Sequence, residues 1–114
     1  MKKEKKNLYE GMYILSATLG EDARKKALDR IVNGIVEKGG EIHKIHEQGR
    51  RRMAYEIKGK REGFYYLVYF SLTPSEISTL WKEYPLHEDL IRFLTLRANE
   101  VKETLEFKPL KIQS

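Results

Sequence analysis

Two stretches of the sequence carry apolar residues at the spacing of an α-helix, and extended apolar segments lie on both sides of each stretch. The first stripe runs from Ala23 to Val36, with charged residues covering the opposite face, and Gly39-Gly40 is expected to end this helix. Pro85 is expected to end the second helix. The apolar stripe of the second helix, expected to be its buried face, comprises Ile77, Leu80, Trp81 and Tyr84.

The residues before each stripe carry a start signal for a helix. Thr18 and Thr73 each stand three residues before a glutamate, which is the spacing of a capping box, where side chains satisfy the free N–H groups of the first turn. Pro74 suits the first turn of the second helix because its missing N–H is not needed there. These signals predict that the helices begin close to Thr18 and Thr73.

The extended segments are residues 8–15, 41–57, 64–72 and 90–96, so the element order is β-α-β-β-α-β. This order predicts an α+β fold, the ferredoxin-like β-α-β-β-α-β sandwich, with a four-stranded antiparallel sheet and two helices on one face. Right-handed crossovers place the first and third strands in the centre. We expect one ferredoxin-like domain at 8–98, after a basic N-terminal arm at 1–7 and before a C-terminal tail at 99–114 that is flexible.

Within the second extended segment, the alternation of apolar and polar residues changes phase. Ile42 is even-numbered, whereas Ile45, Met53, Tyr55 and Ile57 are odd-numbered. Such a change predicts a β-bulge, for which Gly49 is one candidate. His43 and His46 differ by an odd number, so we expect them on opposite faces and a poor pair for a metal ion.

The stretch from Gly49 to Phe70 combines basic and aromatic residues, in a chain whose net charge is +5 and whose pI is about 9.4. It reads as two strands joined by a basic, glycine-containing loop at 58–63. A cationic hairpin that carries aromatic rings suits a polyanion with stackable bases, namely RNA or DNA. The alternative is a core hairpin whose arginines only solvate one edge, and the residues leave both readings open.

The third strand is apolar on both of its faces. The even positions Phe64 to Leu72 form an unbroken apolar row that should face the helices. Tyr65, Leu67 and Tyr69 then point to the uncovered face, where they are candidates for binding a partner. Ordinary cross-strand packing on an open face is the competing reading. The first strand is apolar at both parities, so its facing is left open.

Arginines are the candidates for binding phosphate, because the planar guanidinium can donate to two oxygens at once. Arg50, Arg51 and Arg52 cannot all point the same way, since neighbours on a strand alternate. With Arg92 and Arg97 of the last strand, they could border the sheet with positive charge. Solvated surface arginines with no ligand remain the alternative.

Several classes of protein find no support in the sequence. There is no cysteine, which excludes disulfides, thiolate metal sites and a cysteine nucleophile. No Gly-x-Ser-x-Gly elbow or glycine-rich phosphate loop occurs, and the carboxylates are scattered among basic neighbours. No apolar run is long enough to span a bilayer. We therefore expect a cytoplasmic protein that is not an enzyme and needs no cofactor.

A set of short motifs runs in order through residues 8–98. Tyr9-Glu10 opens the first strand, and Gly49-Arg50-Arg51 leads into Met53-Ala54-Tyr55 and Ile57. Further motifs are Gly39-Gly40, Gly63-Phe64-Tyr65, Glu88-Asp89-Leu90-Ile91-Arg92 and Leu94-Thr95-Leu96-Arg97. In this the chain resembles the family of the sixth protein of the bacterial small ribosomal subunit. Glu56 departs from the family, which usually has proline there, and this puts the local strand-edge geometry in doubt.

The resemblance implies a structural ribosomal protein that pairs with the eighteenth protein of the small subunit and binds the central domain of the small-subunit rRNA with it. Carried over by residue, Tyr9, Arg50, Arg51, Arg92 and Arg97 become candidates for the RNA-facing or partner-facing edge, with Arg52 added from charge alone. The rival readings are a stand-alone single-stranded RNA-recognition domain and a small phosphate-transferring or ligand-sensing enzyme. Glu62 and Tyr65 fit the RNA-recognition motif poorly, and the enzyme lacks a phosphate cradle.

Overall fold

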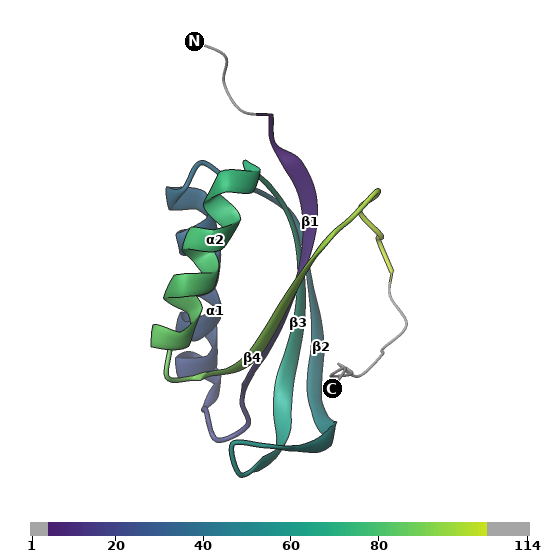
Figure 1. Ribbon diagram of the computed structural model, residues 1–114. Coiled ribbons are helices and arrows are strands. Elements are labelled where there is room, and N and C mark those ends of the chain that lie inside the picture. The colour runs from purple at the N-terminus through teal and green to yellow at the C-terminus, as the bar shows by residue number, and fades with distance from the viewer. Residues whose placement is uncertain (1–4, 105–114) are drawn as a thin grey trace.

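The sheet is antiparallel throughout and has the strand order β2-β3-β1-β4, and the helices lie on one of its faces (Figure 1). The computed structural model describes residues 5–104. The elements are β1 (Asn7–Ser16), α1 (Glu21–Glu37), β2 (Glu41–Ile57), β3 (Lys60–Leu72), α2 (Pro74–Glu83), the 3₁₀ turn η1 (Tyr84–Leu86) and β4 (Leu90–Arg97). The predicted ferredoxin-like order and the central position of the first and third strands are confirmed.

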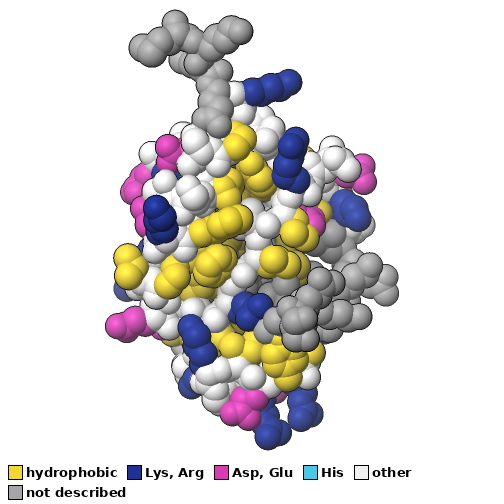
Figure 2. All heavy atoms as spheres, viewed as in Figure 1, with side chains coloured by type: hydrophobic (Ala, Val, Ile, Leu, Met, Phe, Trp, Pro, Cys, Tyr) yellow, Lys and Arg dark blue, Asp and Glu magenta, His cyan; other side chains and the backbone are white. Residues whose placement is uncertain are grey.

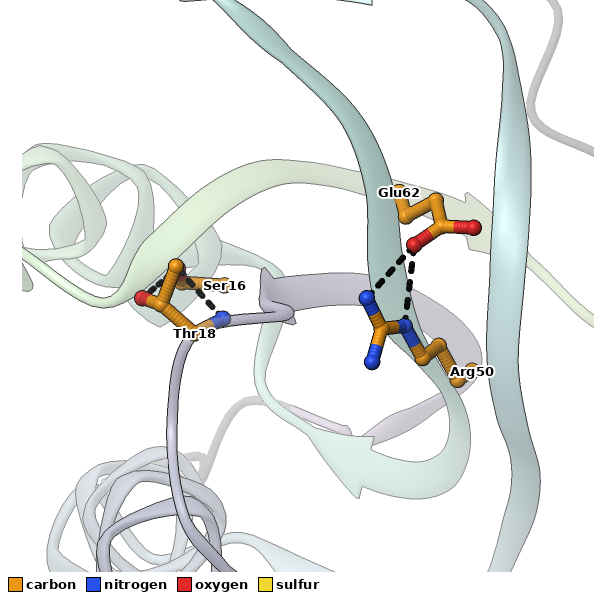
Figure 3. Close-up of polar contacts among 4 residues, drawn as sticks. All are labelled: Ser16, Thr18, Arg50 and Glu62. Carbon is orange, nitrogen blue, oxygen red and sulfur yellow. Dashed lines mark hydrogen bonds and ion pairs between the residues drawn. The ribbon is translucent and has the colours of Figure 1, made fainter.

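Helix α1 begins later than its capping signal predicts. Its N-cap residue is Gly20, and no side chain caps the helix. The Thr18 hydroxyl instead pairs with the Ser16 hydroxyl at 2.8 Å, which holds the turn that follows β1 (Figure 3). The prediction of a capping box at Thr18 is therefore wrong, because a closer hydroxyl competes for the same side chain. The predicted end is confirmed, with Gly39 just beyond the helix at a φ of 86°.

Helix α2 begins where the sequence predicts, with Thr73 at the N-cap and Pro74 in the first turn, although the Thr73 side chain makes no capping hydrogen bond. The predicted buried stripe is correct except for Trp81, whose side chain is 45% exposed. Its indole Nε1–H donates to the Thr95 hydroxyl at 3.2 Å, so the ring lies along the outer side of β4. An amphipathic ring with one hydrogen-bonding group suits such a boundary position.

The main core lies between the sheet and the helices. It contains the even-numbered residues of β3 from Phe64 to Leu72, as predicted, together with Ile31 and Ile35 of α1 and Leu80 of α2. Tyr13 and Tyr84 are also buried there, and their hydroxyl groups form a hydrogen bond of 2.7 Å. This bond joins β1 to the 3₁₀ turn that precedes β4, and so fixes where β4 enters the sheet.

Strand β2 changes its pairing register at two bulges in its first half. One lies between Glu47 and Gly49, where Gly49 has a φ of 80°, so the predicted bulge is confirmed. The other, between Ile42 and Lys44, was not predicted. It brings His43 and His46 to the same face, where they contact Ser71 and Tyr69 respectively, and the prediction of opposite faces is wrong.

The predicted N-terminal arm (1–7) and tail (99–114) fall partly outside the described residues, and only residues 5–7 and 99–104 of them are described. Asn7 is the first residue of β1, and its partner in the register is Leu72 of β3. Residues 99–104 follow β4 and do not extend it.

Candidate nucleic-acid interface

The face of the sheet opposite the helices, here called the open face, has a small core of its own. Ile14, Met53, Tyr65 and Ile91 form this second cluster, with Met12 and Ile57 packed against it. Tyr65, Leu67 and Tyr69 lie on this side, as their alternation with the helix-facing residues of β3 predicts. Their expected exposure is wrong, however, because Tyr65 is 1%, Leu67 5% and Tyr69 1% exposed.

Part of that burial comes from the chain just after β4. Residues 98–104, here called the C-terminal strap, turn to the side of the sheet away from the helices (Figure 1). The His46 Nε2–H donates to the Lys102 carbonyl oxygen at 2.7 Å, and the His46 ring packs edge-on against Tyr69. Lys44 pairs with Glu103 at 3.4 Å. The sequence signal for this strap was weak, since Val101 is its only bulky apolar residue.

The three consecutive arginines of β2 have three different environments. The Nε and Nη2 of Arg50 donate to one oxygen of Glu62 at 3.0 and 2.6 Å (Figure 3). The Nε of Arg51 donates to the Gln48 carbonyl at 2.9 Å, within the bulge. Arg52 is exposed and has no ion pair among residues 5–104. The positive charge of Arg50 is therefore largely compensated, whereas that of Arg52 is available to a ligand.

Arg92 and Arg97 lie on the edge strand β4 but on opposite faces of the sheet. Residues directly opposite in a register share a face. Arg92 stands opposite Ile14, a member of the open-face cluster, and Arg97 stands opposite Tyr9, a member of the helix-side core. Within residues 5–104, neither arginine has an acidic partner at ion-pairing distance.

Tyr9 does not lie on the surface that its predicted role requires. It is 7% exposed, and its ring stacks on Phe70 with 5.7 Å between the ring centroids. The alternation of β1, which the sequence left open, puts Tyr9 and Tyr13 on the helix side and Ile14 on the open face. A direct contact of Tyr9 with RNA would need the core to open, so we leave Tyr9 out of the candidate interface.

Apolar side chains line the outer side of β4. Leu94 is 38% and Leu96 47% exposed on the open face, and Trp81 lies on the helix side of the same strand. Figure 2 shows hydrophobic side chains gathered on this side of the molecule, with lysine and arginine side chains around them. An edge strand with apolar side chains and a basic surround suits a protein partner and an anionic partner together. We did not predict this apolar edge from the sequence.

The described residues offer little for catalysis. No group of three or more histidine or acidic side chains that could hold a metal ion occurs in residues 5–104. His87 stands near the groove between the helices, where burial, followed by the nearby positive charge of Arg30, lowers the pKa of its imidazole. None of the helices in the described part of the chain is long and apolar enough to cross a membrane.

Three comparisons with known proteins agree with one another. The family model described as Ribosomal protein S6 matches residues 8–97. The chain is 66% identical over 113 residues to small ribosomal subunit protein bS6 of Protochlamydia amoebophila, and the match covers 99% of both chains. It is 60% identical over 110 residues to bS6 of Chlamydia pneumoniae, with 96% of this chain and 98% of that protein covered.

Among solved structures, the fold is similar to the crystal structure of 30S ribosomal protein S6 from Thermotoga maritima. The TM-score is 0.78 at 33% sequence identity, and the match covers 82% of this chain and 89% of that chain.

Proposed function

This chain belongs to the ribosomal protein S6 family, and from that premise we propose that it binds the central domain of the small-subunit rRNA cooperatively with a protein partner, the eighteenth protein of the small subunit. The family resemblance stated from the motifs is confirmed. As a ribosomal protein of the small subunit, the protein is a structural component and not an enzyme, and its place is the ribosome in the bacterial cytoplasm.

The observation that carries the proposal is the arrangement along β4, where a basic side chain on each face borders an exposed apolar strip. Arg92 and Arg97 would contact phosphate oxygens, and Leu94 and Leu96 would pack against the partner. Arg51 and Arg52 would add contacts from β2, the opposite edge strand of the sheet, with Arg50 contributing only where RNA phosphate displaces Glu62.

Tyr65, Leu67 and Tyr69 remain our candidates for the partner-binding surface, in a modified role. All three are buried, and the strap covers Tyr69, so a partner would reach this ring only after displacing Lys102 from His46. The partner would then contact Leu94 and Leu96 first, and the part of the open face under the strap second.

Binding of this kind is cooperative because each partner completes the other's site. A coupling free energy of about 1–3 kcal/mol between the protein partner and the RNA would correspond to roughly 5–150-fold tighter binding of each in the presence of the other. The domain alone should therefore bind rRNA weakly and with a steep dependence on salt.

The test is a titration of a labelled central-domain rRNA fragment with this protein, with and without the partner, at two salt concentrations. We expect binding to tighten sharply when the partner is present. Replacing Arg92 by alanine should weaken assembly and lower its salt dependence, whereas Lys25→Ala, an exposed site on α1, serves as a control of equal charge change. Equal affinity with and without the partner would contradict the proposal.

The stand-alone RNA-recognition domain is the second candidate. Such a domain would bind single-stranded RNA tightly and without a partner, through aromatic rings on the central strands. Tyr65 and Tyr69, the rings on the open face of β3, are almost fully buried, which disfavours it.

A further inference from the structure

The ends of β2 and β3 form a two-stranded ribbon that leaves the rest of the sheet. Pairing of β1 with β3 ends at Ser16 and Gly63, whereas β2 and β3 pair again at Ile57 and Lys60, after a register shift between Arg52 and Ile57. Residues 52–62, here called the ribbon, therefore lack a third strand. Figure 1 shows this hairpin projecting beyond the helices and the other strands. Met53 and Ile57 pack into the open-face cluster and anchor the ribbon, whereas all the other residues of 52–62 are exposed. The composition of these exposed positions is therefore free to serve another purpose.

Positive charge is concentrated at this end of the molecule. Residues 50–62 hold six basic and two acidic side chains, a net charge of +4 in a chain whose total is +5. Both carboxylates already contact arginine: Glu62 accepts from Arg50 at 2.6 Å, and Glu56 lies 3.7 Å from Arg61. Of the remaining cations, Arg52, Lys58 and Lys60 have no ion pair within residues 5–104.

The ribbon ends in a tight turn that points a lysine outward. Lys58 has a φ of 51° and Gly59 a φ of 76°, and left-handed conformations at both central residues define a type I′ hairpin turn. Glycine is the usual second residue of such a turn, but lysine is not a usual first one, since residues with a Cβ avoid positive φ. Fixing Lys58 here places its charge at the tip of the ribbon.

Two hollows adjoin each other on the ribbon, and Arg52 and Arg61 line both. The larger, of about 460 Å³, is lined in addition by Ala17, Gly59, Lys60 and Glu62. The smaller, of about 200 Å³, is lined in addition by Met53, Ala54, Tyr55 and Glu56. The Tyr55 side chain is 44% exposed. One hollow thus offers cations beside small residues that permit close approach, and the neighbouring one offers an aromatic ring.

We infer that the ribbon is a second RNA contact, which takes an unpaired nucleotide with its base stacked on Tyr55 and its flanking phosphates held by Arg52 and Lys60. The inference deepens the proposed function and rests on it for the identity of the ligand as RNA. An unpaired nucleotide is required because a base inside a duplex has both faces already stacked, and the major groove of A-form RNA is deep and narrow. Stacking on an exposed ring also tolerates any base.

The experiment compares two labelled probes, a single-stranded oligouridylate of about 12 nucleotides and a fully paired RNA duplex of the same length, with the full chain at low salt. We expect the single strand to bind more tightly than the duplex. Tyr55→Ala should weaken single-strand binding by about tenfold, whereas Tyr55→Phe, which keeps the ring, should bind like the unchanged protein. Circular dichroism of each variant confirms that the exposed substitution leaves the fold intact.

A charge variant tests the phosphate contact separately. Lys60→Gln should reduce the magnitude of the slope of log affinity against log salt for the single strand by about 0.7, which is the value for one phosphate contact. Lys25→Gln on α1 is the control, because it removes the same charge and should leave the slope unchanged. Equal binding of strand and duplex, or a Tyr55→Ala variant that binds like the unchanged protein, would overturn the inference.

The same variants, titrated on the central-domain rRNA fragment with the protein partner, separate the two ideas. If the fragment binds cooperatively but oligouridylate does not bind, the ribbon inference fails and the proposed function stands. If oligouridylate binding depends on Tyr55 but the fragment shows no cooperative binding, the ribbon inference stands and the proposed function fails.

Discussion

Removing the hydrogen bond between Tyr13 and Tyr84 tests quantitatively how the rest of the domain positions β4. The two hydroxyl groups are 2.7 Å apart, the Tyr13 side chain is fully buried, and Tyr84 is 2% exposed. The rings also meet edge to face, with centroids 5.4 Å apart, and Tyr84 contacts Phe93 of β4 in the same way at 4.8 Å. The perturbation is the removal of one hydroxyl at a time, as Tyr13→Phe and Tyr84→Phe, and then of both.

The expected magnitude follows from which groups lose a partner. Each single substitution removes the hydrogen bond and leaves the other hydroxyl buried and unsatisfied, which costs about 1–3 kcal/mol of the free energy of unfolding. The double substitution removes both polar groups and leaves two well-packed rings, so its cost should lie well below the sum of the single costs. For a domain of this size, each 1 kcal/mol lowers the midpoint of thermal unfolding by about 4–8 °C.

The assay is denaturant unfolding followed by circular dichroism, with all variants compared at the same slope against denaturant. Tyr55→Phe is the matched control, because its side chain is 44% exposed and the loss of that hydroxyl should change stability by less than about 0.5 kcal/mol. Costs that add in the double variant would show that the two hydroxyls do not interact, and would refute the account of how this turn is held to β1.

Three further predictions follow from other contacts. Burial raises the pKa of Tyr84 to about 12, against about 10 in an unfolded chain. The stability that the protonated Tyr84 hydroxyl contributes is therefore present below about pH 10 and is lost as the pH rises toward 12. The free energy of unfolding, measured between these two pH values, should depend less on pH in Tyr84→Phe than in the unchanged protein. Gly11→Ala would place a Cβ 2.6 Å from the Tyr13 hydroxyl oxygen and 2.8 Å from its ring, so we expect the free energy of unfolding, measured with denaturant, to fall by about 1–3 kcal/mol. Gly20→Ala is the control, because the space around Gly20 is open, and it should cost less than half as much. Glu62→Gln frees Arg50 from its ion pair, and should steepen the salt dependence of rRNA-fragment binding by about one phosphate contact; an unchanged slope would show that Arg50 does not reach the RNA.

Much of the fold could be predicted because local signals and the global pattern agree. The apolar stripes predict which helix faces are buried, Gly39 predicts where α1 ends, and the even positions 64–72 predict the helix-facing side of β3. The structure agrees with these predictions apart from the exceptions below. Errors arose where a side chain has a hydrogen-bonding partner that residue spacing does not reveal. Thr18 bonds to Ser16 and not to the helix N-terminus, and Trp81 meets Thr95 at the sheet edge and is not buried. Such hydrogen bonds depend on the exact path of the backbone, which residue spacing does not give.

The candidate site was harder to predict than the fold, for two physical reasons. A bulge reverses the facing of every residue beyond it, and the unpredicted one between Ile42 and Lys44 is why His43 and His46 share a face. A mixed-charge segment gives no periodic signal, so nothing in the spacing of residues 98–104 indicated that Lys102 would lie against His46. The exposure of Tyr69 was misjudged for that reason, whereas Tyr65 is buried by the open-face cluster of Ile14, Met53 and Ile91.

The positions of Arg92 and Arg97 on opposite faces of β4 bear on why binding would be cooperative. An RNA strand that contacted both arginines would have to cross the edge strand, where Leu94 and Leu96 are exposed. Phosphate groups gain nothing from apolar side chains, and crossing them would cost part of their hydration. A protein partner that covered the two leucines would remove this cost and could supply polar groups of its own to the RNA. On this reasoning the partner increases RNA affinity by covering the apolar side chains that the RNA would otherwise cross, even if neither arginine moves.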